Sequence, residues 1–262
     1  MTALLCGLAA AASTAAITAA HHAERLPGGS ARWARINHAG HPVTLTEGVA
    51  LGAGLAAALL IADPPAALAV LGSGVAGGID DLAGATDTKG LRGHLAALRA
   101  GRVTTGVLKI GLLAASGLAA CAWSDQRAGR LGLHSLTGGA LVAGSANLAN
   151  LFDLRPGRAL KVGLAVAAPL ALTASPAAGA VVGAGLIVLP ADLRGASMLG
   201  DTGANPLGAA AGLAAAQALG PAGRLVALMG VTGLTLLSEK VSFSKVIEGT
   251  PALRRLDAWG RP

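Results

Sequence analysis

Apolar runs of roughly 15 to 20 residues recur along almost the whole chain, and this repetition restricts the fold more than any other feature. Of the 262 residues, 53% are hydrophobic and only 13% are charged, whereas a soluble domain carries about 25% charged residues. A helix formed by such a run is long enough to cross the hydrocarbon core of a bilayer. The sequence therefore predicts an all-α, polytopic membrane helix bundle with the lipid bilayer as its immediate partner.

The runs predict about nine transmembrane helices. Several runs consist mainly of Ala and Gly, which let helix backbones approach closely, so we expect residues 1–238 to form one compact transmembrane bundle. The predicted spans are residues 2–20, 47–62, 64–79, 103–122, 132–149, 159–173, 177–190, 205–219 and 222–238.

The charged residues divide unevenly between the two sides of such a bundle. If the N-terminus lies outside, the cytoplasmic segments are the loops 21–46, 80–102, 150–158 and 191–204 and a basic amphipathic tail, 239–262. All charged residues then lie on or beside cytoplasmic segments except Asp63, Asp125, Arg127, Arg130 and Arg224. Because Lys and Arg favour cytoplasmic loops, we expect the N-terminus outside and the C-terminus inside the cell membrane. The net charge of +7 then reflects topology and lipid headgroups, and nucleic acid is excluded as a partner.

The stretch GGIDDLAG, residues 77–84, places Asp80 and Asp81 side by side at the end of an apolar run. Adjacent carboxylates repel, and the C-terminal end of a helix is already negative. One interpretation is a solvated helix end. The other is a divalent cation or a metal-bound phosphate that offsets the repulsion.

The stretch SANLANLFD spaces Asn147, Asn150 and Asp153 three residues apart, which places them on one face of a helix. Amides inside a bundle can simply join neighbouring helices by hydrogen bonds. A stripe that ends in a carboxylate also suits a polar binding site.

The stretch MLGDTGANPLG places Asp201 between Gly200 and Gly203, where the backbone can approach a ligand closely, so Asp201 is a candidate metal ligand. Asn205 and Pro206 predict the N-cap and the first residue of the following helix.

Lys109 lies about one and a half turns into the predicted span 103–122. It either extends to the membrane interface or faces a polyanionic substrate. Just before it, residues 89–102 alternate Leu and Arg, which predicts an amphipathic helix on an anionic leaflet, with His94 as an ordinary part of it.

Taken in order, these motifs resemble those of the polyprenyl-phosphate sugar-1-phosphate transferases, which include phospho-N-acetylmuramoyl-pentapeptide transferase and the N-acetylglucosamine-1-phosphate transferases. The resemblance covers most of the chain. It rests on NHAGHPVTLTEG (37–48), GGIDDL, NLANLFD and MLGDTGANPLG, and on the position of Lys109. MLGDTGANPLG is the most specific of these matches.

The resemblance implies a reaction in which a membrane polyprenyl phosphate attacks the β-phosphate of a UDP-sugar, with an N-acetylhexosamine as the expected sugar. The products are a polyprenyl-diphosphate-sugar for cell-envelope glycan synthesis and UMP, and Mg²⁺ is the implied cofactor. Homodimers are common in the family, so a second copy of the chain is an implied partner. The implied catalytic residues are Asp80, Asp81 and Lys109, the implied magnesium ligands are Asp201 and Asn150, and the implied substrate-binding residues are Asn147, Asp153, Asp192 and Lys240.

Two departures from the family keep other hypotheses open. Pro156 stands where the family has a second aspartate, and SEKVSFSK replaces a His-rich or Arg-rich motif, with Lys240 and Lys245 as candidate substitutes. They motivate a second hypothesis, a relative that binds lipid phosphate or nucleotide-sugar as a scaffold without turnover. A third is a small transporter, although its polar residues would be expected nearer the middle of the membrane.

Overall fold

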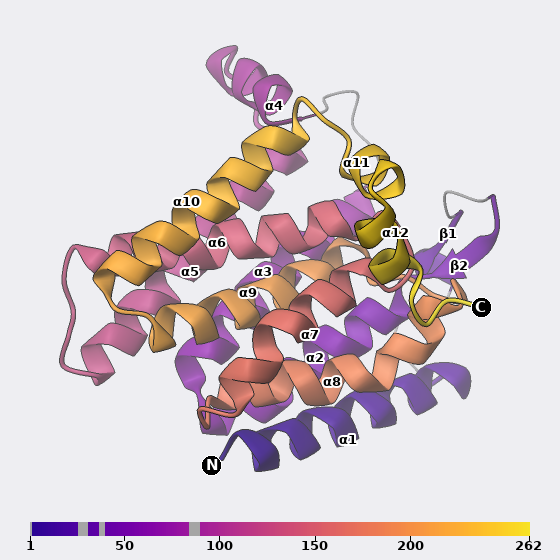
Figure 1. Ribbon diagram of the computed structural model, residues 1–262, viewed down its shortest axis with the longest axis horizontal. Helices are drawn as coiled ribbons and strands as arrows, with labels where there is room; N and C mark the ends of the chain where they lie inside the picture. Colours follow the sequence, from indigo (N-terminus) through magenta and orange to yellow (C-terminus); the bar gives the residue numbers. More distant parts are fainter. Residues whose placement is uncertain (1, 26–30, 37–39, 84–89) are drawn as a thin grey trace.

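The computed structural model describes residues 2–25, 31–36, 40–83 and 90–262, without the side chains of residues 90–92 and 95. Within these ranges the chain forms twelve α-helices, one short 3₁₀ helix and one small β-hairpin, so the predicted all-α class is confirmed (Figure 1). Residues 37–39 of the motif at 37–48, and residue 89 and four side chains of the amphipathic segment, lie outside the described part.

The helices lie close to the predicted runs. Their bounds are α1 (Ala3–His22), α2 (Thr46–Ala62), α3 (Pro64–Ala83), α4 (Gly90–Arg99), α5 (Thr105–Arg127), α6 (His134–Phe152), α7 (Arg158–Ala171), α8 (Pro176–Leu193), α9 (Gly200–Ala218), α10 (Pro221–Ser238), α11 (Phe243–Gly249) and α12 (Pro251–Ala258). The 3₁₀ helix η1 (Ala31–Trp33) leads into strand β1 (Ala34–Ile36), which pairs antiparallel with β2 (Pro42–Thr44).

Five of the described helices are long and apolar enough to cross a membrane, namely α1, α3, α5, α8 and α10. This supports a multi-pass membrane protein, but the predicted number of nine spans is wrong. The other four runs also form helices, yet α2 and α7 have only 17 and 14 residues, α6 contains amide side chains, and α9 contains amide side chains and an acidic one. A helix enclosed by other helices need not be as long or as apolar as one that faces lipid.

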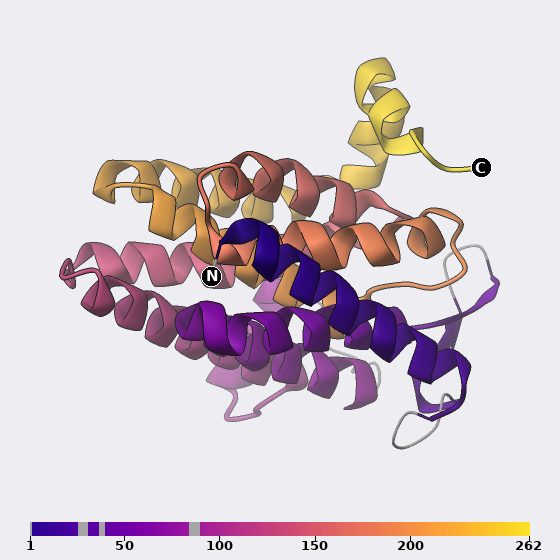
Figure 2. The ribbon, with the colours of Figure 1, turned by 90° about the horizontal axis from the view of Figure 1, so that it is seen from below.

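Helix α9 lies at the centre of the bundle (Figures 1 and 2). Thirteen of its 19 residues are buried, and it packs most extensively against α3 and α6 and also contacts α2, α5, α7 and α8. By contrast, only Arg224 of α10 is buried, and the outer face of this helix is apolar and exposed. The bundle therefore has a helical core surrounded by helices that present apolar side chains outward.

Glycines set the spacing between the helices. A Cβ atom on Gly183 of α8 would lie 1.9 Å from the carbonyl oxygen of Gly7 in α1, and one on Gly179 would lie 2.0 Å from that of Ala3. Such distances are impossible for real atoms, so α1 and α8 can pack this closely only because these positions lack side chains. The predicted close packing of Ala- and Gly-rich helices is confirmed.

At one end of the bundle, a buried ion pair joins α5 to α10. Arg224 donates from Nη1 and Nη2 to the two carboxylate oxygens of Asp125 at 2.6 and 2.7 Å, and both side chains are fully buried or nearly so. Arg130 also donates to Asp125, and Gln217 donates to Asp63. Four of the five charged residues that the sequence placed on the outer side therefore lie in one polar network.

The C-terminal tail packs against the first residues of α7, which begins at Arg158. Arg158 donates to both carboxylate oxygens of Asp257 at 2.7 and 3.0 Å and to Ser244 Oγ at 3.0 Å. Burial raises the pKa of Asp257, but the Arg158 guanidinium outweighs it and holds that pKa below its usual range. The rings of Phe152 and Phe243 stack with centroids 5.1 Å apart. The predicted amphipathic tail is thus attached to the bundle by a nearly buried ion pair.

We expect Gly183→Ala to destabilise the protein, because the added methyl group must push α8 away from α1. Overpacking of this kind costs about 1–3 kcal/mol. Gly230→Ala is the matched control, since the space around Gly230 of α10 is open and alanine favours the helix. Thermal unfolding of detergent-solubilised protein should show a lower midpoint for the first variant alone. Equal midpoints would contradict the close α1–α8 contact.

Candidate functional site

Three charged side chains from three helices meet at the end of the bundle opposite the Arg224 pair. Lys109, in the second turn of α5, forms ion pairs with Asp201 in the first turn of α9 and with Asp80 in the last turn of α3. The distance from Lys109 Nζ to Asp80 Oδ2 is 3.5 Å. The side chains of Lys109, Asp201 and Asp80 are 10%, 17% and 30% exposed, so the cluster is shielded but accessible from one side.

Asp81 does something different from Asp80, although the two are adjacent in sequence. Its carboxylate accepts hydrogen bonds from the backbone N–H of Asp201 at 3.3 Å, the N–H of Thr202 at 2.8 Å and the Thr202 hydroxyl at 2.6 Å. These are unpaired donors of the first turn of α9, where the helix dipole is positive. Asp81 therefore caps α9 from another helix, and the repulsion at the end of α3 is offset by the start of α9.

This cap explains why the sequence misplaced the start of α9. Asn205 and Pro206 were predicted as its N-cap and first residue, but the helix begins at Gly200, and both residues are buried inside it. Because Asp81 satisfies the donors at positions 201 and 202, the helix extends upstream of the local capping signal. The close approach of α3 to the start of α9 requires glycine at position 77, because an added Cβ atom there would lie 2.1 Å from the carbonyl oxygen of Asp201.

The carboxylates of two further predicted site residues also accept hydrogen bonds from backbone N–H groups. Asp153, which ends α6, accepts a hydrogen bond from the N–H of Gly200 at 2.9 Å, and Asp192 of α8 accepts one from Gly157 at 3.0 Å. Burial and the nearby charge of Asp192 raise the pKa of Asp153 well above its usual range, although the Gly200 N–H acts against this. These carboxylates fix the α6–α7 and α8–α9 connections beside the cluster.

Two cavities flank the cluster. The first, of about 420 Å³, lies between α3, α4, α5, α6 and α10, and is lined by Asp80, His94, Lys109, Asn147, Asn150, Thr235 and Glu239 together with apolar side chains of α5 and α6. The second, of about 380 Å³, is lined by Arg35, Asp81, Asn150, Asp153 and Asp201 among others. Asn150 lines both cavities, Asn147 lines the first and Asp153 lines the second, so all three predicted residues lie beside the cluster.

The structure places one residue at the site that the sequence did not predict, and it places two predicted site residues outside both cavities. Arg35 enters the second cavity from β1 and donates to the backbone carbonyl of Asp81. No local pattern marked it, because the β1–β2 hairpin places it there. Lys240 is exposed at the end of α10 and lines neither cavity, and Asp192 lies outside both as well.

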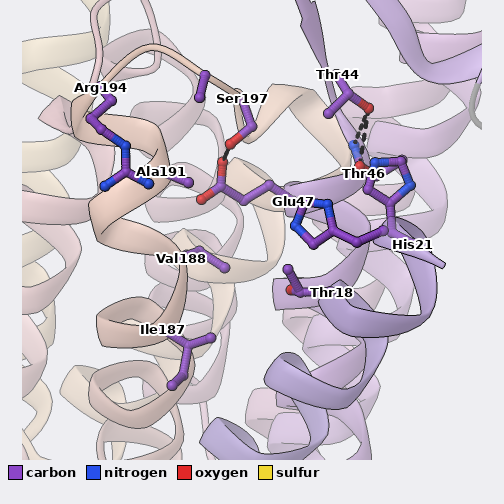
Figure 3. A pocket seen from close by; sticks show the side chains of 12 residues that line it. Thr18, His21, Thr44, Thr46, Glu47, Ile187, Val188, Ala191, Arg194 and Ser197 are labelled. Atoms are coloured by element: carbon purple, nitrogen blue, oxygen red, sulfur yellow. Dashed lines mark hydrogen bonds between the residues drawn. The ribbon is translucent and has the colours of Figure 1, made fainter.

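A third pocket, of about 210 Å³, lies on the other side of the α8–α9 connection (Figure 3). In it the Glu47 carboxylate of α2 accepts a hydrogen bond from the hydroxyl of Ser197, and His21 of α1 also lines the pocket. Ser197 also pairs with Thr44 of β2. The loop that carries Asp201 is therefore held from both sides, by Asp81 and Asp153 on one side and by Glu47 on the other.

The chemistry of the donors suits a magnesium ion only in part. The described residues contain no group of three His, Cys, Asp or Glu side chains close enough to hold a metal on their own. The side chains of Asp201 and Asn150 line one cavity and supply two oxygen donors. Mg²⁺ is commonly bound by one or two carboxylates, with substrate phosphates and water as the other ligands. The residues therefore fit a magnesium ion that arrives with a phosphate substrate.

Comparison of the sequence with models of protein families finds no match, and comparison with curated proteins finds none either.

We expect Asp81→Ala to lower stability much more than Asp80→Ala. The first leaves partly buried N–H donors of α9 without an acceptor, and an unpaired buried donor costs up to about 1–3 kcal/mol. The second removes one ion pair of a partly exposed carboxylate. Thermal unfolding in detergent measures both variants. If Asp80→Ala has the larger effect, the capping role assigned to Asp81 is wrong.

Proposed function

We propose that the protein is a phosphoglycosyltransferase that moves a sugar-1-phosphate from a UDP-sugar to a polyprenyl phosphate in a Mg²⁺-dependent reaction. The observation that carries the proposal is the position of Lys109, between Asp80 and Asp201 and beside two cavities. The motifs that resemble the transferase family are far apart in sequence, and the helices bring their charged residues to one place. The transferred sugar would be an N-acetylhexosamine, in the service of cell-envelope glycan synthesis.

The two cavities suit two different substrates. The first is walled by Ile110, Leu113 and Ala114 of α5 and lies beside α10, whose surface is exposed and apolar, so it suits an amphiphile entering from lipid. The second contains Arg35 and polar groups beside the β1–β2 hairpin, which suits a nucleotide-sugar from the aqueous side. Asn150 faces both, where the phosphates of the two substrates would meet.

In the proposed reaction, an oxygen of the lipid phosphate forms a bond to the β-phosphorus of the UDP-sugar. The bond from that phosphorus to the oxygen bridging to the α-phosphate breaks, and UMP leaves with the electron pair. Both reactants are anions, so Lys109 contributes by neutralising charge on the diphosphate in a shielded site. Mg²⁺ held by Asp201 and Asn150 would supply further positive charge to the same phosphates.

The proposed location is the cell membrane, with the N-terminus outside and the site on the cytoplasmic side, where UDP-sugars are available. The buried network of Arg224 and Asp125 would then lie at the outer end. A homodimer stays part of the proposal through the family resemblance alone.

A specific observation supports a second candidate, a non-catalytic protein that binds the same ligands. The carboxylates of Asp81 and Asp153 accept hydrogen bonds from backbone N–H groups, and Pro156 stands where the family has another aspartate. These acids have clear structural roles without any turnover.

The test is UMP release by purified protein in lipid nanodiscs with undecaprenyl phosphate, Mg²⁺ and a panel of UDP-sugars. We expect Asp201→Asn to lower the rate about 10²–10³-fold, as for loss of one electrostatic contact to the transition state. Asp63→Asn, at the opposite end of the bundle, is the control and should keep the wild-type rate. No release from any donor, with ligand binding retained, would favour the non-catalytic candidate.

A further inference from the structure

We propose that His94 binds the phosphate of the lipid substrate through its Nε2–H group. This inference rests on the proposed function for the identity of the lipid, and it assigns a role to a residue that the sequence placed only on an amphipathic surface helix. The argument depends on how the imidazole ring is held and on what the cavity around it contains.

The ring is held by two contacts with the start of α5. His94 Nδ1 lies 2.9 Å from the Thr104 hydroxyl oxygen. The ring also covers Gly106, where a Cβ atom would lie 2.3–2.6 Å from three ring atoms, Nε2, Cε1 and Cδ2. Helix α4 can therefore bring this side chain to α5 only because position 106 is glycine.

The hydrogen bonds of Thr104 are compatible with a His94 ring that carries its proton on Nε2. As the N-cap of α5, the Thr104 oxygen accepts a hydrogen bond from the N–H of Val107 at 3.2 Å. When the Thr104 hydroxyl donates its own hydrogen to His94 Nδ1, the neutral ring carries its proton on Nε2, and this is the tautomer that we assign in the proposal. Nε2 has no hydrogen-bond partner among the residues that the structure describes. A donor thus stands unused beside the cavity.

The surroundings favour a phosphate attached to a long apolar chain. His94 lines the 420 Å³ cavity together with Lys109 and Asn147, which supply an ammonium group and amide N–H donors, and the carboxylates of Asp80 and Glu239 line it as well. The apolar part of the wall includes Ile110, Leu113 and Ala114 of α5 and Ala143 and Leu151 of α6, and it lies next to α10, whose outer face is exposed and apolar. A phosphate oxygen between Lys109 and His94 would accept from both, while the chain lies along the apolar wall.

The experiment measures binding of farnesyl phosphate to the full-length protein in detergent, with farnesol as the control ligand that lacks the phosphate. His94→Ala should weaken farnesyl phosphate binding about tenfold, as expected for a hydrogen bond to a charged group. The amide nitrogen of Gln can take the place of Nε2, whereas that of Asn takes the place of Nδ1. His94→Gln should therefore stay within about threefold of wild type, and His94→Asn should resemble His94→Ala.

The outcomes separate this inference from the proposed reaction. Loss of farnesyl phosphate affinity with an unchanged Michaelis constant for the UDP-sugar supports the inference. The same binding pattern in a protein that releases no UMP also supports it, and the transferase proposal alone fails. If His94→Asn binds normally and His94→Gln does not, the ring acts only through Thr104 and the inference is overturned. Wild-type affinity in all three variants, or no binding by the wild type, also overturns it.

Discussion

The capping of α9 by Asp81 is the interaction on which the rest of the site depends. A carboxylate at the negative end of α3 meets the positive start of α9, and each helix end offsets the unfavourable field of the other. The contact needs the glycine at position 77, because the two backbones almost touch there. With α9 anchored in this way, Asp201 is brought to Lys109, and the loop before it is held by Asp153 and Glu47.

The paired aspartates therefore divide two tasks between them. Asp81 turns inward and secures a helix, which leaves Asp80 to face Lys109 and the larger cavity. A shielded ammonium group between two carboxylates leaves the cluster with a net charge of about −1. The proposed reaction of two anionic substrates would therefore require a metal ion and further cations, such as Arg35. Because Asp81 holds the backbone of α9 and Asp80 faces the cavity, the site is rigid and the cavity stays open.

The scaffold achieves rigidity with few large side chains. Glycines on α1, α2, α3 and α8 allow helix backbones into direct contact. At the end of the bundle opposite the candidate site, the buried Arg224–Asp125 ion pair joins α5 to α10. Without a strong hydrophobic force between helices in lipid, such close packing and interhelical hydrogen bonds are the main sources of cohesion. The tail adds a second attachment through Arg158 and Asp257.

The sequence alone determined the all-α class, the approximate positions of the helices and the charged motifs, because these depend on local periodicity and composition. It overestimated the number of spans, since a hydropathy pattern does not show which helices are enclosed by others. It misplaced the start of α9 because the cap comes from Asp81, some 120 residues earlier in the chain. Arg35 and His94 carried no local signal, since a hairpin and a glycine contact place them. Only the tertiary structure decided which carboxylates face a cavity and which hold backbone, because that depends on distant donors competing for the same oxygens.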